Sequence, residues 1–142
     1  MKAELLRVFA AGVGAVLSFF TGLPPLLLAL LATMTLDYAT GLLCALMGRS
    51  MKTENGGLSS GAAFFGLMKK ALILGVVALS ALLDFAVQSG AGVSFSAVTG
   101  ASCLWFIAAE GLSIVENAAG MGVPIPEALR GALEAMKGRQ TD

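Results

Sequence analysis

Long apolar runs, separated by short polar or proline-containing breaks, dominate this chain of 142 residues. Four of them predict helices at about residues 8–23, 26–47, 64–85 and 97–118. The last three are long enough to cross a bilayer, whereas the first, of about 16 residues, reaches only roughly 24 Å at 1.5 Å per residue. We therefore expect an all-α integral membrane protein with four transmembrane helices, or three if the first segment lies in the membrane interface.

The breaks between the apolar runs contain residues that are typical of turns and helix caps. Pro24 and Pro25 lack N–H donors and mark a turn after the first run. Residues 48–63 form the one long polar loop, in which Ser59 or Ser60 is placed to cap the helix that follows. No Gly-Lys-Ser/Thr follows the loop glycines, so the loop does not have the pattern of a phosphate-binding loop.

The C-terminal segment predicts a short amphipathic helix. Glycines stop the fourth helix, Pro124 and Pro126 turn the chain, and a helix of about residues 125–137 follows. One face is apolar and the opposite face is charged, the latter with Glu127, Arg130, Glu134 and Lys137. We expect this helix on the cytoplasmic side, on lipid headgroups or against a partner subunit, and treat residues 1–142 as a single membrane domain.

Composition supports the membrane assignment and excludes several functions. The chain is 57% hydrophobic and 13% charged, against roughly 25% charged residues in soluble domains. Its zero net charge and few aromatic residues argue against a nucleic-acid partner. It has no His and two distant cysteines, Cys44 and Cys103, so neither a transition-metal site nor a disulfide framework is expected. We find no nucleophile–base pair or cofactor loop, and expect neither an enzyme nor a cofactor.

The distribution of basic residues predicts the orientation. With four spans and a cytoplasmic N-terminus, all nine Lys and Arg residues lie on the cytoplasmic side, as does the C-terminus. With three spans the last three helices keep this orientation. A signal peptide is an alternative for the first run, but no convincing A-x-A site follows it.

Small residues recur at every fourth position of the first run, at Ala10, Gly14, Ser18 and Gly22. On a helix they share a face on which another backbone can approach closely. The alternative is the general Gly and Ala richness of membrane helices.

A carboxylate lies near the centre of the second predicted span. At 100° per residue a stripe of polar and small residues passes through it, consisting of Thr33, Asp37, Thr40, Gly41, Cys44 and Gly48. A charge at this depth costs a few kcal/mol, so the stripe is expected to face protein or water. The alternative is a polar residue that serves only helix packing.

The fourth predicted span carries a second polar face, which consists of Glu110, Ser113, Asn117 and Gly120, with Glu116 at its flank. Lys69 and Lys70 occur in the early turns of the third span, at a similar predicted depth. We hypothesise that one of these glutamates pairs with one of these lysines, within or between subunits. Alternatively, the lysines snorkel to the interface and Glu116 lies among headgroups.

Four sequence blocks in order resemble the toxin-secretion and phage-lysis holin family. They are the stretch from Asp37 to Leu46, the paired serines followed by 66–70, the stretch from Glu110 to Asn117, and 122–126 with Leu129. The resemblance covers about residues 30–137. Its signature positions here are Asp37, Thr40, Gly41, Lys70, Glu110, Ser113, Glu116, Asn117, Pro124 and Pro126.

The resemblance implies a multi-pass protein of the bacterial cytoplasmic (inner) membrane. Such a protein forms homo-oligomers in membrane lipid and opens lesions through which endolysin, a cell-wall hydrolase, or a large toxin passes. One departure is that Gly61 and Ala62 follow the paired serines, where many members have basic residues.

Two other functions fit four short helices with a buried acid. A small proton-coupled multidrug-type exporter would need a cavity rich in Trp and Tyr, and this chain has one of each. A structural membrane subunit without a pore of its own is the third possibility.

Overall fold

A computed structural model describes residues 2–21, 23–92 and 97–138. All the regular structure within these ranges is helical, which confirms the all-α class. The helices are α1 (Lys2–Thr21), α2 (Pro25–Leu46), α3 (Ser60–Ala91), α4 (Ala97–Gly120) and α5 (Glu127–Gly138).

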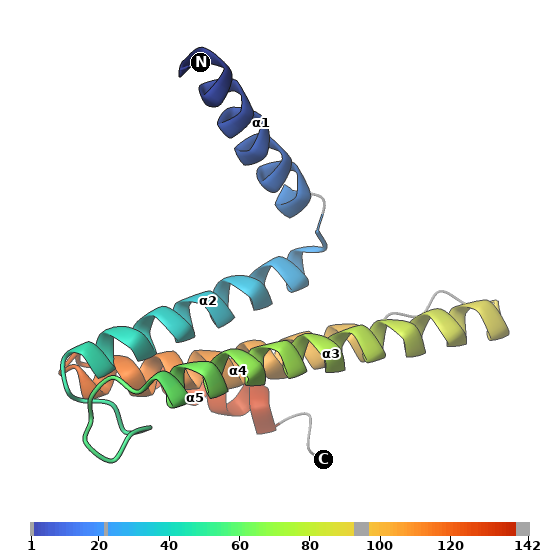
Figure 1. Ribbon diagram of the computed structural model, residues 1–142. Coiled ribbons are helices and arrows are strands. Elements are labelled where there is room, and N and C mark those ends of the chain that lie inside the picture. The colour runs from blue at the N-terminus through green and yellow to red at the C-terminus, as the bar shows by residue number, and fades with distance from the viewer. Residues whose placement is uncertain (1, 22, 93–96, 139–142) are drawn as a thin grey trace.

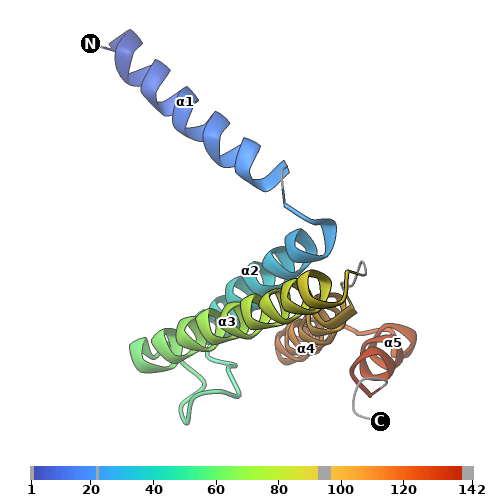
Figure 2. The same cartoon turned by 90° about the vertical axis from the view of Figure 1, so that its right-hand side faces the viewer.

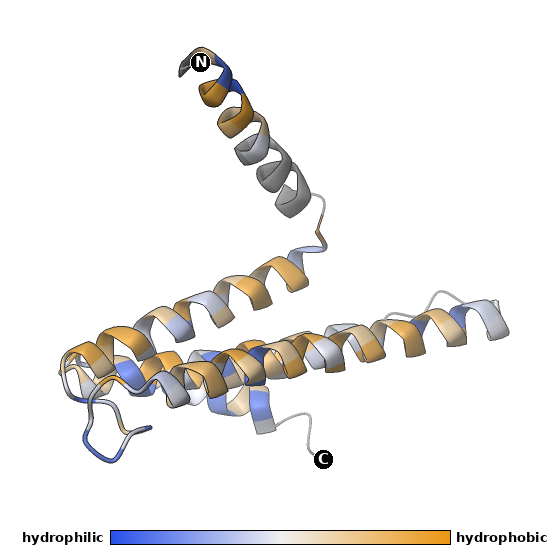
Figure 3. Cartoon of the chain, in the orientation of Figure 1, coloured by the Kyte–Doolittle hydropathy of each residue, from blue (hydrophilic) through white to orange (hydrophobic). Residues whose placement is uncertain are grey.

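Three of the described helices, α2, α3 and α4, are long and apolar enough to cross a membrane. Hydrophobic residues cover most of their length, whereas hydrophilic residues concentrate in the α2–α3 loop and on α5 (Figure 3). A fourth transmembrane helix, which the sequence placed at about residues 8–23, is not confirmed. The first helix begins at Lys2 rather than at residue 8, so it includes Glu4 and Arg7 in its first turns and leaves a shorter apolar remainder.

The three long helices form an up-down-up bundle (Figures 1 and 2). The central helix is α4, which packs extensively against α2 and also against α3, while α2 and α3 make few contacts with each other. In both views α1 projects away from this bundle. The position of α4 leaves a seam between α2 and α3.

The apolar core fills the half of the bundle that is nearer to Pro24. Its buried members come from all three long helices and are Leu30, Met34, Ile73, Val77 and Cys103. Leu27, Phe106 and Ile107 pack around them. The other half of the bundle, toward the α2–α3 loop, contains most of the buried polar groups. The bundle therefore has an apolar end and a polar end.

Side-chain and glycine caps fix the helix connections. Ser59 Oγ accepts a hydrogen bond from the Ala62 N–H at 3.3 Å, which confirms one of the two caps predicted for α3. In the preceding loop Gly56 has a φ of +68°, and a Cβ there would lie 2.4 Å from the carbonyl oxygen of Gly48. At the other end of α3, Asp84 accepts hydrogen bonds from the N–H groups of Val98 and Thr99, at 3.1 and 2.8 Å, and so caps the first turn of α4.

The third span is longer than its apolar pattern predicted. The sequence placed it at about residues 64–85, but α3 has 32 residues and begins at Ser60. The polar and small residues that follow Ser59 were assigned to the loop, whereas the serine cap makes them the first turn of the helix. At 1.5 Å per residue α3 is about 48 Å long.

The amphipathic helix α5 packs against α4 of its own chain, a contact that the sequence did not predict. It runs back along α4, so that Leu133 reaches Gly111, where an added Cβ would lie 2.8 Å from Leu133 Cδ2. The Lys137 ammonium lies 5.6 Å from the centroid of the Trp105 ring, a cation–π contact. The absence of a side chain at Gly111 permits this close approach.

Candidate functional site

Three ionisable side chains meet at one depth of the bundle. Asp37 precedes the end of α2 by nine residues, Glu110 precedes the end of α4 by ten, and Lys70 follows the start of α3 by ten. At 1.5 Å per residue each lies about 14–15 Å from the loop-side end of its helix. Half of a 30 Å hydrocarbon core is the same distance, so a bilayer around this bundle would place the three groups near its centre.

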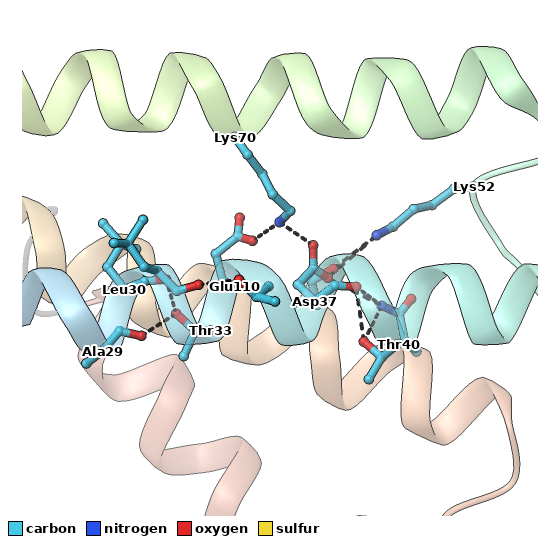
Figure 4. A network of polar contacts seen from close by, with 12 residues as sticks. Ala29, Leu30, Thr33, Asp37, Thr40, Lys52, Lys70 and Glu110 are labelled. Atoms are coloured by element: carbon cyan, nitrogen blue, oxygen red, sulfur yellow. Dashed lines mark hydrogen bonds and ion pairs between the residues drawn. The ribbon is translucent and has the colours of Figure 1, made fainter. Parts of the chain in front are cut away.

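Lys70 bridges the two carboxylates. Its ammonium Nζ donates to Asp37 Oδ2 at 2.7 Å and to Glu110 Oε2, so that one cation from α3 holds an anion from each of the other two helices (Figure 4). Glu110 is 2% exposed and Lys70 8%. The pairing of Lys70 with Glu110 is one of those that the sequence left open, and it occurs within a single chain.

An amide and a hydroxyl complete the shell around Asp37. Asn117 Nδ2 donates to Asp37 Oδ1 at 3.3 Å and lies 3.2 Å from Thr40 Oγ1. Thr40 Oγ1 in turn donates to the Asp37 carbonyl oxygen at 3.1 Å. Gly41 lies beside the amide, where an added Cβ would be 3.5 Å from Asn117 Nδ2, an ordinary van der Waals contact. Four of the predicted residues of α2 and α4 therefore lie together.

Lys52 is a second cation of the network, and the sequence analysis missed it. From the α2–α3 loop, its Nζ lies 3.8 Å from Asp37 Oδ1 and donates to Ser113 Oγ at 3.1 Å. Its side chain is 56% exposed, so it closes the network on the side of the loop. Two carboxylates near one buried lysine leave one negative charge unbalanced, and that imbalance was the available signal for a second cation nearby.

Two cavities beside the network follow the seam between α2 and α3. A narrow one of about 80 Å³ lies beneath the loop and is lined by Asp37, Tyr38, Lys52 and Lys70, among others. A wider one of about 470 Å³ is lined by Asp37, Lys52, Phe65, Lys69 and Lys70 together with small residues of α3. Both cavities have walls of mixed character, in which Asp37, Lys52 and Lys70 supply polar groups that water can contact. They connect the Asp37 carboxylate with the loop side of the bundle.

Lys69 and Glu116 do not join the network. Both side chains are exposed on the surface of the bundle. The expectation that both lysines snorkel is wrong for Lys70, which is buried and directed at Asp37 and Glu110. Lys70 lies nearly three turns inside α3, which begins four residues earlier than predicted, and unlike Lys69 it lies on the face that packs toward α2 and α4.

The remaining residues of the Asp37 stripe serve local structure. Thr33 Oγ1 donates back to the carbonyl oxygens of Ala29 and Leu30. Cys44 Sγ donates to the Arg49 carbonyl oxygen at 3.1 Å, and Gly120 lies against the same sulfur. These contacts join the end of α2 to the end of α4.

The small-residue stripe on α1 has no packing partner among the described residues. Ala10 and Gly14 are exposed, and an added Cβ at Gly14 would meet nothing within 4 Å. The Ser18 side chain and Gly22 lie outside the described part of the chain, so the stripe as a whole stays a prediction.

The turn residues Pro124 and Pro126 lie between α4 and α5 as predicted. The carbonyl oxygen of Pro126 accepts hydrogen bonds from the N–H groups of Leu129 and Arg130, and so begins α5. The two prolines stop α4 and allow the chain to reverse along it.

The network holds charge where a bilayer would otherwise exclude it. Asp37 and Glu110 carry two negative charges, and Lys70 and Lys52 carry two positive charges, so the cluster is neutral as a whole. Within a membrane such charges are stable only when paired or in contact with water. In the closed bundle this requirement is met by pairing, because Lys70 contacts both carboxylates.

Comparison with known proteins gives a consistent picture. The model of the bacteriophage holin family matches residues 14–138 of this chain. An uncharacterised protein of Halalkalibacterium halodurans is 30% identical over 138 residues, which are 96% of this chain and 97% of the relative. A 14.9 kDa protein encoded in the nagH 3′ region of Clostridium perfringens is 33% identical over 114 residues, 80% of this chain and 78% of the relative.

No solved structure matches the chain significantly. The family match spans α2 to α5 entirely and includes every member of the charge network. Holins in general are membrane proteins and not enzymes. On this match, and with three helices able to cross a membrane, the chain belongs to the bacteriophage holin family.

Proposed function

We propose that this protein is a holin that assembles in the bacterial cytoplasmic membrane and opens lesions in it. The observation that carries the proposal is the neutral cluster of four charged side chains about halfway along the long helices. A helical membrane protein without a polar pathway gains nothing from such a cluster, because desolvation makes buried ion pairs costly. A lesion-forming protein uses the same groups as the wettable lining of the opened state.

The seam between α2 and α3 is the place where opening would require the least disruption. These two helices make few contacts with each other, and Lys70 and Lys52 span the gap between them. If the seam opens in an assembly of several copies, the ion pairs among Asp37, Lys70 and Glu110 break. Each of these side chains then contacts water or a side chain of a neighbouring copy. The closed bundle is thus the dispersed form in lipid, and the homo-oligomer is the active form.

The cargo in this proposal is a folded protein of the cytoplasm. Family membership supports an endolysin that degrades the cell wall, or a large secreted toxin, as the functional partner. The basic residues of the α2–α3 loop support a cytoplasmic location for that loop. Lys52, which closes the network on the side of the loop, then lies toward the side from which the cargo would arrive.

The test is inducible expression in bacteria with and without a co-expressed endolysin that lacks a signal peptide. Turbidity and membrane potential are followed together, and membrane accumulation is verified by immunoblot. The expected result is abrupt depolarisation, with turbidity falling only when endolysin is present. Unchanged potential at verified accumulation would refute the holin assignment, and depolarisation without endolysin-dependent lysis would refute passage of folded protein.

Asp37→Asn separates this function from proton-coupled export. An exporter that uses Asp37 as its proton switch loses transport completely in this variant. A holin retains depolarisation, and the time at which it triggers changes, because the amide still occupies the site but no longer balances Lys70 and Lys52. Unaltered timing in the variant, together with loss of a proton-linked drug efflux, would favour the exporter.

A further inference from the structure

The charged face of α5 lies beside the middle of a membrane-spanning helix. Leu133 packs against Gly111, and Lys137 lies over Trp105. Positions 105–111 are the central part of α4, which runs from Ala97 to Gly120. If α4 crosses a bilayer, as the proposed function requires, the docked α5 carries its charges to a depth where lipid cannot solvate them.

The charges of α5 occupy one narrow face, and Lys137 is the one member of it that contacts the bundle, through the Trp105 ring. At 100° per residue they fall within an arc of about 80°, and they are Glu127, Arg130, Glu134 and Lys137. All four are exposed, whereas Leu133 and Met136, which share the side that faces α4, are half-buried. Among the described residues no ion pair includes any of the four. In hydrocarbon this face would cost several kcal/mol, and so it requires a partner.

When the sequence of α5 is read backwards, each charge is replaced by one of opposite sign. Along the helix the signs are negative, positive, negative, positive, with spacings of three, four and three residues. When two such helices lie antiparallel about a twofold axis at position 132, Glu127 meets the second copy's Lys137 and Arg130 meets the second copy's Glu134. The twofold axis repeats both pairs, so all eight charges are matched. Reciprocity of this kind characterises an interface between identical chains.

The surface beside these charges permits close approach of a second helix. Gly131 lies next to the charged face, and a Cβ added there would meet nothing within 4 Å. Its neighbours toward the side away from α4 are Ala128 and Ala135, which are exposed. Small residues of this kind allow helix backbones to pack tightly in membranes.

We propose that α5 is a homodimerisation helix, whose charged face docks antiparallel on the same face of a second copy. The alternative is that the charges pair only within their own helix at spacings of three and four, as on many exposed helices. The two arrangements predict opposite results when two different charge-reversed chains are mixed.

The test uses Arg130→Glu and Glu134→Arg in the full chain, each carried on two differently tagged copies. Co-purification of the two tags from solubilised membranes measures self-association. Each variant alone places like charges opposite each other in the antiparallel pair, and association with itself is expected to fall by at least about tenfold. Co-expression of one variant with the other makes every contact between chains attractive again, and co-purification is expected to return to the wild-type level.

Pairing within the helix predicts no such recovery, because each mixed chain still has its own unfavourable charges. Failure of the mixed pair to recover, or single variants that associate like the wild type, would overturn the proposed interface. The Lys69→Glu variant is the matched control, since it reverses an exposed charge far from α5. The readout is independent of lysis, so failure of the interface and failure of the holin function are distinguishable.

Discussion

Two adjacent lysines of α3 show how a single residue position decides the role of a charge. Lys69 is exposed on the bundle surface, while Lys70 is buried between two carboxylates. The side chains are chemically the same, and the difference of 100° around the helix separates them. Substitution of each therefore measures the contribution of position rather than of residue type.

Lys70→Met is expected to destabilise the bundle strongly, because it leaves Asp37 and Glu110 buried with only Lys52 to balance them. Loss of one partner of a buried pair typically costs about 3–5 kcal/mol. Lys69→Met, at an exposed site, is expected to change stability by no more than about 0.5 kcal/mol. Thermal unfolding in detergent micelles and membrane accumulation measure both.

Addition of Glu110→Gln to the Lys70→Met variant provides the second half of this test. It removes one of the two carboxylates left without Lys70, so part of the lost stability is expected to return. If Lys70→Met is as stable as Lys69→Met, the network does not stabilise the closed bundle.

At the scale of elements, the position of α5 depends on one glycine. The side chain of Leu133 occupies the space that a Cβ at Gly111 would need. The turns and prolines between α4 and α5 reverse the direction of the chain, so that α5 runs along α4. The contact at Gly111 then determines how closely α5 packs against α4.

Gly111→Ala is therefore expected to displace α5 from α4, and trypsin is expected to cleave after Arg130 several times faster than in the wild type. Leu133→Ala in the same chain removes the obstructing atoms and is expected to restore slow cleavage. Gly75→Ala is the control, since a Cβ there would meet nothing within 4 Å. Equal cleavage rates in Gly111→Ala and Gly75→Ala would show that α5 does not depend on this contact.

At the scale of the whole molecule, three spans give the chain a definite topology. The loop with Lys52 and the C-terminal end of α3 lie at opposite ends of the bundle, and the basic residues Arg49 and Lys52 belong to that loop. The positive-inside bias predicts that the α2–α3 loop lies in the cytoplasm.

Single cysteines at exposed positions test this topology with a membrane-impermeant thiol reagent on intact cells. In a chain whose Cys44 and Cys103 are replaced by Ser, Gly90→Cys is expected to react and Glu54→Cys is expected to react only after lysis. With three spans, Ala3→Cys reacts as Gly90→Cys does. Protection of Ala3→Cys in intact cells would show that α1 crosses the membrane, as the four-span alternative predicted.

The sequence by itself indicated that this protein resides in a lipid bilayer rather than in water, and it predicted most of the helices. Apolar runs of spanning length have no other stable arrangement in lipid than helices, because each backbone group must find its partner within the segment. The stripe through Asp37 and the face through Glu110 were also predictable, since helical periodicity assigns polar residues to one side whatever that side contacts.

Only the tertiary structure decided which charges meet. Lys70 and not Lys69 joins the carboxylates, because only Lys70 lies on the face of α3 that packs toward α2 and α4, and the pattern of α3 alone does not say which of its faces packs there. Lys52 reaches Asp37 from a loop, and a loop has no period from which the direction of a side chain can be read. The return of α5 along α4 depends on space at Gly111, a property of two surfaces in contact. Periodicity describes one helix at a time. The pairing of charges, the reach of the loop lysine and the docking of α5 depend instead on the distances between helices.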